Sequence, residues 1–357
     1  MATQRRLSIF TRSVHGGHAP RDPHAVVPAA PPIVPTVGYV HPSMESSDHA
    51  LGSPGGDSAH PLDFVYARGG AQTQVLLEDA IAHLEESEGA LSFASGMAAI
   101  HAAILACVPA GGVIVAAEQL YGVTRSLLDW LVGAMGMQVH YVDVFNLDQV
   151  QEAVTRLAPA AVMCEVLTNP LARVVRVDRV AEIAREAGAH LIVDNTFATP
   201  FLIHPLSCGA SLVVHSATKF LNGHGDVLGG VVAGPANLLQ VVRGHRKLLG
   251  SNLGPFEAWL ALRGMRTFAV RMRQACLNAR QVAAWLDDNE RVETLFYPGL
   301  SSDPHHEDAR DLFRRNNFGA MLAFRLRDAG RAEVFSFIER LQLILPVTSL
   351  GDVTTLI

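Results

Sequence analysis

Lysine is scarce in this sequence, which narrows the search for chemistry that needs an amine. Of the 28 lysine and arginine residues, only Lys219 and Lys247 are lysines. Lys219 follows the apolar run at residues 212–215, whereas Lys247 lies in the basic segment 243–247 and is expected on a solvated surface. Burial lowers the pKa of an ammonium group, and a lysine of low pKa can form a Schiff base. A lone lysine at a strand end more often extends to solvent, so both interpretations stay open here.

Asp194 is the second candidate, because it follows the apolar run at residues 190–193 and precedes Lys219 by 25 positions. Alone, Asp194 is as typical of a turn as of a functional carboxylate. Together, an acid and a lysine at the ends of two strands indicate pyridoxal phosphate. In enzymes that use this cofactor, a carboxylate keeps the pyridine nitrogen protonated and a lysine holds the aldehyde as an imine.

Residues 93–100 predict a seat for the phosphate group, because a strand is followed by a turn of small residues and then by a helix. The free N–H groups at the start of a helix attract an anion. Ser95 is equally typical of an ordinary helix N-cap. A helix end contributes only about 0.3–1 kcal/mol per charge at exposed sites, so an arginine is expected to assist. Arg68 is the candidate, with a plain surface arginine as the alternative.

Alternating helices and short apolar strands must position these residues. Helices are predicted at residues 74–86, 96–106, 148–157 and 177–187. Strands are predicted at residues 90–93, 113–116, 139–142, 161–164, 190–193, 212–215 and 230–233. This alternation predicts an α/β fold with a mostly parallel sheet and helices on both faces. In such folds the site lies at the carboxyl ends of the strands.

Three regions are predicted along the chain. Residues 1–65 are rich in Pro, Gly, Ser and His and are expected to form an extended, irregular N-terminal arm. The apolar patch of the arm, at residues 29–40, needs a surface on either the chain's own body or a second subunit. Residues 66–265 are expected to form the large cofactor-binding domain, and residues 266–357 a smaller, incomplete C-terminal α/β domain. A long helical section is predicted from about residue 256 to residue 288.

The composition excludes several classes of protein. With 49% hydrophobic and 17% charged residues, the chain is expected to be a soluble globular enzyme. Its net charge of -6 gives no basic field for nucleic acid or an anionic membrane. The four cysteines have no paired spacing, so neither disulfides nor a metal site is expected. Without a long apolar run or an export signal after Arg5-Arg6, the expected location is the cytoplasm.

The motifs resemble those of the Cys/Met-metabolism family of fold-type-I pyridoxal-phosphate enzymes. The most specific pieces are Ser216-Ala217-Thr218-Lys219 and the segment 193–196, and the resemblance covers about residues 12–357. This family includes cystathionine gamma-synthase, cystathionine gamma- and beta-lyases, methionine gamma-lyase and O-acetylhomoserine sulfhydrylase. The resemblance implies the α/β fold of a fold-type-I PLP-dependent transferase. It also implies a homotetramer built from catalytic dimers, which suits an N-terminal arm.

The resemblance also implies a role for each site residue. Lys219 would hold pyridoxal 5'-phosphate and move protons between substrate carbons, and Asp194 would pair with the pyridinium nitrogen. Tyr121 would stack on the ring and act as an acid or base at the leaving group, and Ser349 would lie near the substrate carboxylate. The other implied cofactor-binding residues are Gly96, Met97, Ser216 and Thr218 at the phosphate, Tyr66 and Arg68 from a neighbouring subunit, Asn169 at the cofactor hydroxyl, and Thr196.

Several positions depart from the pattern of the family. Residues 71–72 are Ala-Gln where similar enzymes usually have Asn-Pro, and residues 166–167 are Val-Leu where they have Ser-Pro. Val123 replaces the cysteine that is usual in methionine gamma-lyases. Thr348 replaces an acidic residue that is frequent in cystathionine enzymes acting at the gamma carbon, whereas Asp352 resembles the methionine gamma-lyases. The carboxylate-binding arginine of the family is expected beyond Ile357.

The implied function is that of a trans-sulfuration enzyme of cysteine and methionine metabolism. Such a lyase or gamma-replacement transferase would cleave or form a carbon–sulfur bond at the gamma carbon of cystathionine or a homoserine-derived amino acid. Methionine gamma-lyase and O-acetylhomoserine sulfhydrylase activities are alternatives. An aminotransferase or decarboxylase of the same fold is a further alternative, and so is a catalytically inactive PLP-binding subunit. A nicotinamide enzyme is disfavoured, because no Gly-x-Gly-x-x-Gly motif follows the first strand.

Overall fold

The computed structural model describes residues 7–17, 28–52 and 64–357, and its centre is a sheet of seven strands. These strands are β1 (Gly89–Phe93), β2 (Val113–Ala117), β3 (Gln138–Val142), β4 (Ala161–Glu165), β5 (His190–Asp194), β6 (Leu212–Ser216) and β7 (Gly230–Gly234). Their order is β1-β7-β6-β5-β4-β2-β3. Strands β3, β2, β4, β5 and β6 run parallel, and β7 is antiparallel to both of its neighbours. The predicted mostly parallel sheet is confirmed.

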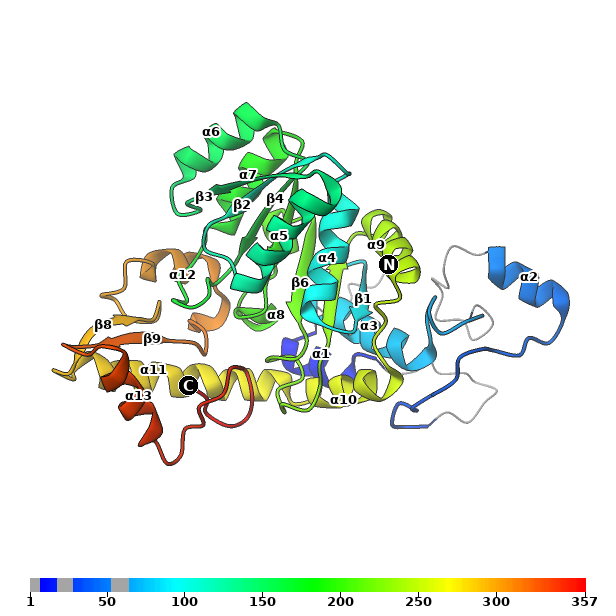
Figure 1. The fold of residues 1–357 in the computed structure, drawn as a ribbon. Coiled ribbons are helices and arrows are strands. Elements are labelled where there is room, and N and C mark those ends of the chain that lie inside the picture. Colours follow the sequence, from blue (N-terminus) through cyan, green and yellow to red (C-terminus); the bar gives the residue numbers. More distant parts are fainter. Residues whose placement is uncertain (1–6, 18–27, 53–63) are drawn as a thin grey trace.

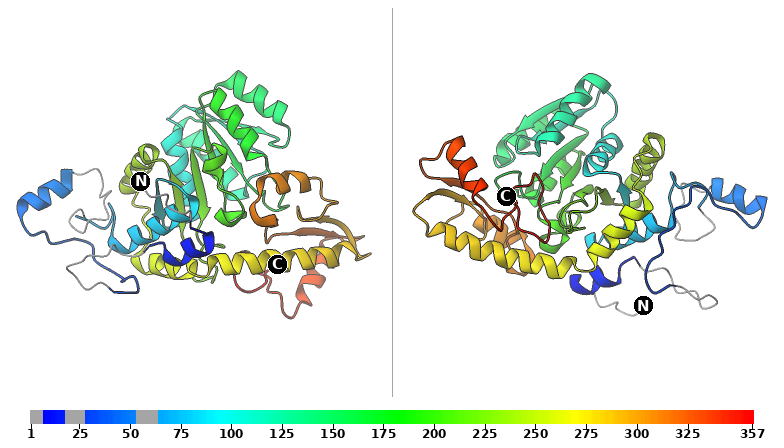
Figure 2. Two further views of the ribbon diagram at one scale, coloured as in Figure 1. Left: turned by 180° about the vertical axis from the view of Figure 1, so that it is seen from behind. Right: turned by 60° about the horizontal axis from the view of Figure 1, so that its bottom comes forward.

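Helices cover both faces of the sheet, as predicted (Figures 1 and 2). One face carries α4 (Gly96–Cys107) and α5 (Gly122–Met135), and the other carries α6 (Leu147–Leu157) and α7 (Val177–Glu186). The buried residues of α7 include Val177, Val180, Ala181 and Ala184, at the spacing of one helical face. This apolar stripe packs against β4 and β5.

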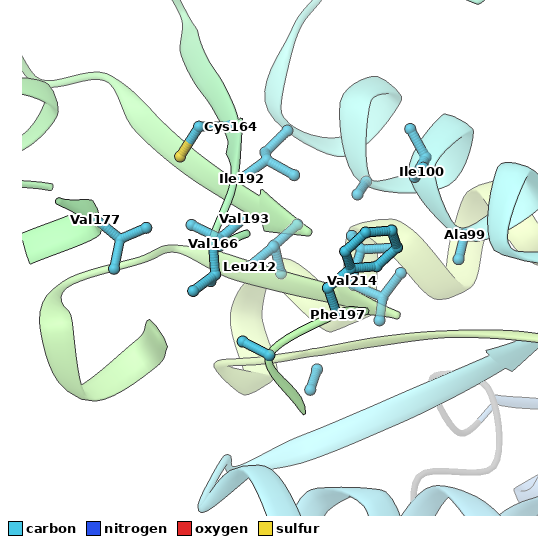
Figure 3. Close-up of a cluster of buried hydrophobic side chains, with 14 of the residues drawn as sticks. Ala99, Ile100, Cys164, Val166, Val177, Ile192, Val193, Phe197, Leu212 and Val214 are labelled. Atoms are coloured by element: carbon cyan, nitrogen blue, oxygen red, sulfur yellow. The ribbon is translucent and has the colours of Figure 1, made fainter. Parts of the chain in front are cut away.

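The core lies between the central strands and these helices (Figure 3). Strands β4 and β6 are almost entirely buried, and their short runs of apolar residues suit a sheet that is covered on both sides. Ile192 and Val214 from neighbouring strands lie in this cluster with Ile100 of α4 and Val177 of α7. The packed core fixes the strand ends, where the polar residues begin.

The N-terminal arm is less irregular than predicted, because it contains the helices α1 (Ile9–His15) and α2 (Met44–Gly52). Ser8 caps α1 by accepting a hydrogen bond from the Thr11 amide at 3.2 Å. Part of the apolar patch lies on the chain's own body. The Val34 amide donates to Thr73 Oγ1 at 3.0 Å in α3 (Gln72–Glu85), and the Trp259 indole donates to the Pro31 carbonyl at 2.9 Å.

The predicted helical section at residues 256–288 is confirmed, and it consists of two helices, α10 (Pro255–Met265) and α11 (Phe268–Asp287). Helix α9 (Ala236–Leu249) precedes them, and short segments α8 (Thr199–Leu202) and η2 (Pro205–Cys208) link β5 to β6. The C-terminal part of the chain contains the antiparallel strands β8 (Val292–Phe296) and β9 (Ala323–Leu326). It also contains α12 (His306–Leu312), η3 (Arg314–Asn316) and α13 (Arg331–Glu339).

Long apolar helices of the kind that cross a bilayer are absent from the described residues. The longest helix is α11, with 20 residues, and it carries arginines along its length.

Candidate active site

A cavity of about 380 Å³ opens where the central strands end. Glu165, Asp194 and Ser216 are the last residues of β4, β5 and β6, and all three line the cavity. These three strands each extend one residue beyond their predicted ends, so the three polar residues are the last residues of their strands. The site therefore lies at the carboxyl ends of parallel strands, as expected for this kind of fold.

Most of the predicted site residues meet in this cavity. Those that line it are Gly96, Met97, Tyr121, Asn169, Asp194, Thr196, Ser216, Thr218, Lys219 and Ser349. They come from six separate stretches of the chain, so the fold brings together residues that are far apart in sequence.

Lys219 lies in the turn after β6 and faces the cavity instead of extending to solvent. Its amide donates to the Ser216 carbonyl at 3.2 Å, and its own carbonyl accepts from the Gly223 amide at 2.8 Å. The Nζ atom donates to Ser349 Oγ at 3.0 Å. Burial lowers the pKa of this amine, which favours the neutral, nucleophilic form. Lys247, by contrast, is exposed on α9, as predicted.

The Asp194 carboxylate is the acidic counterpart of Lys219 in the cavity. Its Oδ1 atom accepts a hydrogen bond from the Thr196 amide at 2.8 Å. Burial raises the pKa of Asp194, and the hydrogen bonds from Thr196 oppose this shift. A protonated nitrogen placed against this carboxylate would satisfy it, because an opposite charge favours the ionised form.

The predicted phosphate seat has the expected local structure. Ser95 Oγ caps α4 by accepting from the Ala98 amide at 3.1 Å, which leaves the first-turn amides of Gly96 and Met97 without partners inside the helix. The N-cap interpretation of Ser95 and the phosphate-seat interpretation are thus compatible. A Cβ atom on Gly96 would lie 2.9 Å from Ser216 Cβ, so the glycine lets the helix start approach the end of β6 closely.

Glu165 also lines the cavity, although it was not predicted from the sequence as a site residue. Its Oε1 atom accepts from the Tyr121 amide at 2.6 Å, and its Oε2 atom accepts from the Asn169 amide at 3.1 Å. Burial and the charge of Asp194 raise the pKa of Glu165 to about 8. The available signal was its position one residue beyond a predicted strand, which is the signal that identified Asp194.

An apolar wall completes the cavity. Its members outside the predicted set are Ile100, Leu167, Phe197, Leu228, Val347 and Leu350. Thr348, at one of the positions that depart from the family pattern, lines the same wall.

Tyr66 and Arg68 do not line this chain's cavity. Arg68 Nη1 donates to the Lys247 carbonyl at 2.6 Å, and the Arg68 carbonyl accepts from Asn252 Nδ2 at 2.7 Å. Tyr66 is 51% exposed and pairs with Gly38 in an isolated bridge. Their contribution to the site of a neighbouring subunit stays a prediction.

The residues present fit pyridoxal phosphate. A volume of about 380 Å³ lies within the range of about 300–1,000 Å³ that is typical of cofactor sites. The cavity offers an amine for an aldehyde, a buried carboxylate for a pyridine nitrogen, and a helix start with hydroxyl groups for a phosphate. The fold and the cavity thus define an α/β enzyme of the pyridoxal-phosphate class.

Comparison with known proteins places the chain within this class. A family model described as Cys/Met metabolism PLP-dependent enzyme matches residues 10–357. An L-methionine gamma-lyase of Fusobacterium nucleatum subsp. polymorphum is 37% identical over 334 residues, covering 92% of this chain and 81% of that protein. A cystathionine beta-lyase of Lactococcus lactis subsp. cremoris is 36% identical over 351 residues, covering 98% of this chain and 87% of that protein.

A solved structure shows the same likeness. The cystathionine gamma synthase from Xanthomonas oryzae pv. oryzae, in complex with aminoacrylate and cysteine, matches with a TM-score of 0.87 and 33% identity. The match covers 98% of this chain and 85% of that one. The chain belongs to the Cys/Met metabolism PLP-dependent enzyme family, so the resemblance drawn from its motifs is confirmed.

Proposed function

We propose that the chain is a pyridoxal-phosphate enzyme that cleaves or forms a carbon–sulfur bond at the gamma carbon of cystathionine or a homoserine-derived amino acid. The observation that carries this proposal is that the Lys219 amine and the Asp194 carboxylate face one cavity. Membership of the family supports it, as do the names of the relatives, which are lyases and a synthase of sulfur amino acids. Methionine gamma-lyase activity is the second candidate, favoured by the relative from Fusobacterium.

The residues around the cavity divide the chemistry between them. Pyridoxal phosphate, when bound, withdraws electrons from the alpha carbon of the substrate. Asp194 would hold the ring nitrogen in its protonated form, and the Thr196 amide fixes the Oδ1 atom of Asp194 by a hydrogen bond of 2.8 Å. Lys219 removes the alpha proton and carries it toward the neighbouring carbon, while Ser349 Oγ orients its Nζ atom at 3.0 Å.

Proton transfer at the leaving group falls to Tyr121 in this scheme. Tyr121 lines the cavity at the start of α5, and its side chain is 44% exposed, so the ring is free to stack and its hydroxyl to reach a departing sulfur. Phe197, the buried part of the apolar wall, contributes to the burial that lowers the pKa of Lys219 and so helps to keep its amine neutral.

The proposed assembly is a cytoplasmic homotetramer built from catalytic dimers. Two observations support an interface near the arm. Val37 and Val40 of the apolar patch are 60% and 102% exposed, so this part of the patch is not covered by the chain's own body. Arg68 and Tyr66 lie close by, outside their own chain's cavity.

Cofactor attachment offers a direct test, because the chain contains only two lysines. Borohydride reduction of the holoenzyme, followed by peptide mapping, is expected to place the pyridoxyl group on Lys219. Lys247 serves as a built-in control, and a label on Lys247 would refute the assignment. Lys219→Ala is expected to abolish the label, and Lys247→Ala is expected to leave it unchanged.

Substrate assays separate the remaining alternatives. Cystathionine, methionine and O-acetylhomoserine would each be supplied with and without a thiol, and ammonia, 2-oxo acid and new thioether would be measured. Release of ammonia and a 2-oxo acid without an amino acceptor excludes an aminotransferase. Turnover by the isolated homo-oligomer excludes an inactive subunit, whereas bound cofactor without turnover of any of these substrates would contradict the proposed function.

A further inference from the structure

Glu165 joins two segments of the site that are separate in sequence. The Tyr121 amide lies at the start of α5, after β2, and the Asn169 amide lies in the loop after β4. One oxygen of the Glu165 carboxylate accepts from each amide, at 2.6 Å and 3.1 Å. The carboxylate is therefore a bridge between the segments that carry the Tyr121 and Asn169 side chains into the cavity.

Burying the Glu165 carboxyl group beside a second carboxyl group costs free energy. Glu165 is only 6% exposed, and it lies in register with Asp194 on the neighbouring strand. Within the described part of the chain, no lysine, arginine or histidine forms an ion pair with it. Burying a carboxyl group without a cation costs free energy, which here only its hydrogen bonds to the two amides or its protonation can offset.

We propose that Glu165 is a positioning residue that fixes the spacing between the Tyr121 and Asn169 segments around the cofactor. The inference rests on the proposed cofactor site. Both carboxylate oxygens are engaged with backbone amides, so Glu165 acts through the two segments rather than on the substrate. A protonated ring nitrogen held by Asp194 would offset the repulsion between the two carboxylates. Glu165 could then accept hydrogen bonds from both amides in its ionised form.

A carboxylate is better suited to this bridge than an amide side chain. Glutamine carries one acceptor oxygen, so it can satisfy only one of the two amides and would direct its own N–H group at the other. Aspartate retains both oxygens but is one methylene shorter, so it reaches the two segments poorly. Glu165→Gln thus tests the bridge with almost no change in side-chain volume.

Asp303 provides a matched control within the same chain. Its Oδ2 atom accepts from the Tyr297 amide at 3.0 Å, and its Oδ1 atom accepts from the His305 amide at 2.8 Å. It is therefore another carboxylate that bridges two backbone amides, but it does not line the cavity. Asp303→Asn removes an equivalent bridge away from the cofactor.

The experiment compares the two variants with the wild-type enzyme. Apoenzyme would be titrated with pyridoxal phosphate, and circular dichroism of the bound cofactor would report its orientation. Glu165→Gln is expected to weaken cofactor binding roughly tenfold, which corresponds to about 1.4 kcal/mol, and to change the cofactor signal. It is also expected to lower kcat more than it raises KM. Asp303→Asn is expected to lower the thermal midpoint without changing these cofactor properties.

Each outcome supports or overturns the inference. If Glu165→Gln changes only the thermal midpoint, as Asp303→Asn does, the bridge is merely structural and the inference is wrong. If Glu165→Gln does not fold, Glu165→Asp is used, and an unchanged cofactor signal in that variant has the same meaning. Failure of the wild-type chain to bind pyridoxal phosphate would instead contradict the proposed function itself.

Discussion

The two carboxyl groups at the ends of β4 and β5 dominate the electrostatics of the cavity at the scale of single residues. Glu165 and Asp194 lie in register on adjacent parallel strands. Burial raises the pKa of each, and their mutual repulsion adds to the shift of Glu165, whose pKa is about 8. The hydrogen bonds from Tyr121, Asn169 and Thr196 oppose these shifts.

The raised pKa of Glu165 predicts how the stability of the apoenzyme depends on pH. The folded state holds a proton on Glu165 up to about pH 8, whereas the unfolded chain loses it near its ordinary value of 4.5. The stabilising contribution of this proton is fully present below pH 4.5 and is lost as the pH rises to about 8. The loss is at most about 1.4 kcal/mol per pH unit.

Glu165→Gln removes this contribution, because an amide does not titrate. The wild-type apoenzyme is therefore expected to lose stability relative to Glu165→Gln between pH 5 and pH 8, over the window set by the two pKa values. Urea midpoints of the two apoenzymes at both pH values provide the measurement. A constant difference between the two midpoints would show that Glu165 does not titrate in this range.

Some of the site residues could be inferred from the sequence because their types are unusual where they occur. Lys219 is one of two lysines and follows an apolar run, and Asp194 ends another. Glu165 gives the same strand-end signal, but its partners are the backbone amides of Tyr121 and Asn169, and main-chain donors leave no trace in a sequence.

At the scale of elements, the contact between the start of α4 and the end of β6 forms the base of the cavity. Gly96 lies against Ser216, and both line the cavity. A Cβ atom on Gly96 would meet the Cα atom of Ser216 at 3.1 Å as well as its Cβ atom at 2.9 Å. Because Cα belongs to the backbone, the helix or the strand would have to move to admit a methyl group.

Gly96→Ala is therefore expected to displace the first turn of α4 and weaken cofactor binding. Overpacking of this kind costs about 1–3 kcal/mol, and a cost of that size in the cofactor-bound state corresponds to a loss of affinity of about 5-fold to 150-fold. Gly133→Ala is the control, because nothing lies within 4 Å of a Cβ atom at that position in α5. This control is expected to stabilise the enzyme by about 0.5–1 kcal/mol, since alanine is the better helix former.

Cofactor titration and thermal unfolding of the two glycine variants check this expectation. Equal cofactor affinity in Gly96→Ala and the wild-type enzyme would show that the close approach of α4 and β6 is not needed for the site.

The ends of an element could be predicted where the local sequence pattern determines them. They could not be predicted where contacts with distant parts of the chain determine them. The strands followed from their apolar runs. The corner between α10 and α11 did not, because Arg271 fixes it by donating hydrogen bonds to the carbonyl groups of Gly264, Phe220 and Leu221. This corner lies against the turn that follows Lys219, so its position depends on a distant part of the chain.

At the scale of the whole molecule, the cavity collects predicted site residues from six stretches of one chain but not Tyr66 or Arg68. Hydrogen bonds to Lys247 and Asn252 hold Arg68 against its own chain. The sequence alone could not assign Arg68 to a cavity by physical reasoning, because its own pattern is that of a surface arginine. If Arg68 acts in the cavity of a neighbouring subunit, each complete site forms only when two subunits assemble.

Subunit mixing tests this arrangement, because Lys219 and Arg68 would then belong to different sites of a catalytic dimer. Lys219→Ala and Arg68→Ala are each expected to impair both sites of their own homodimers. In a mixed dimer, the Arg68→Ala subunit supplies Lys219 and its partner supplies Arg68, so one of the two sites is intact. Random mixing at equal amounts makes half of the dimers mixed, and activity is expected to rise to about one quarter of the wild-type value. If Arg68 acts within its own chain, or not at all in catalysis, mixing produces no activity beyond the sum of the two separate variants.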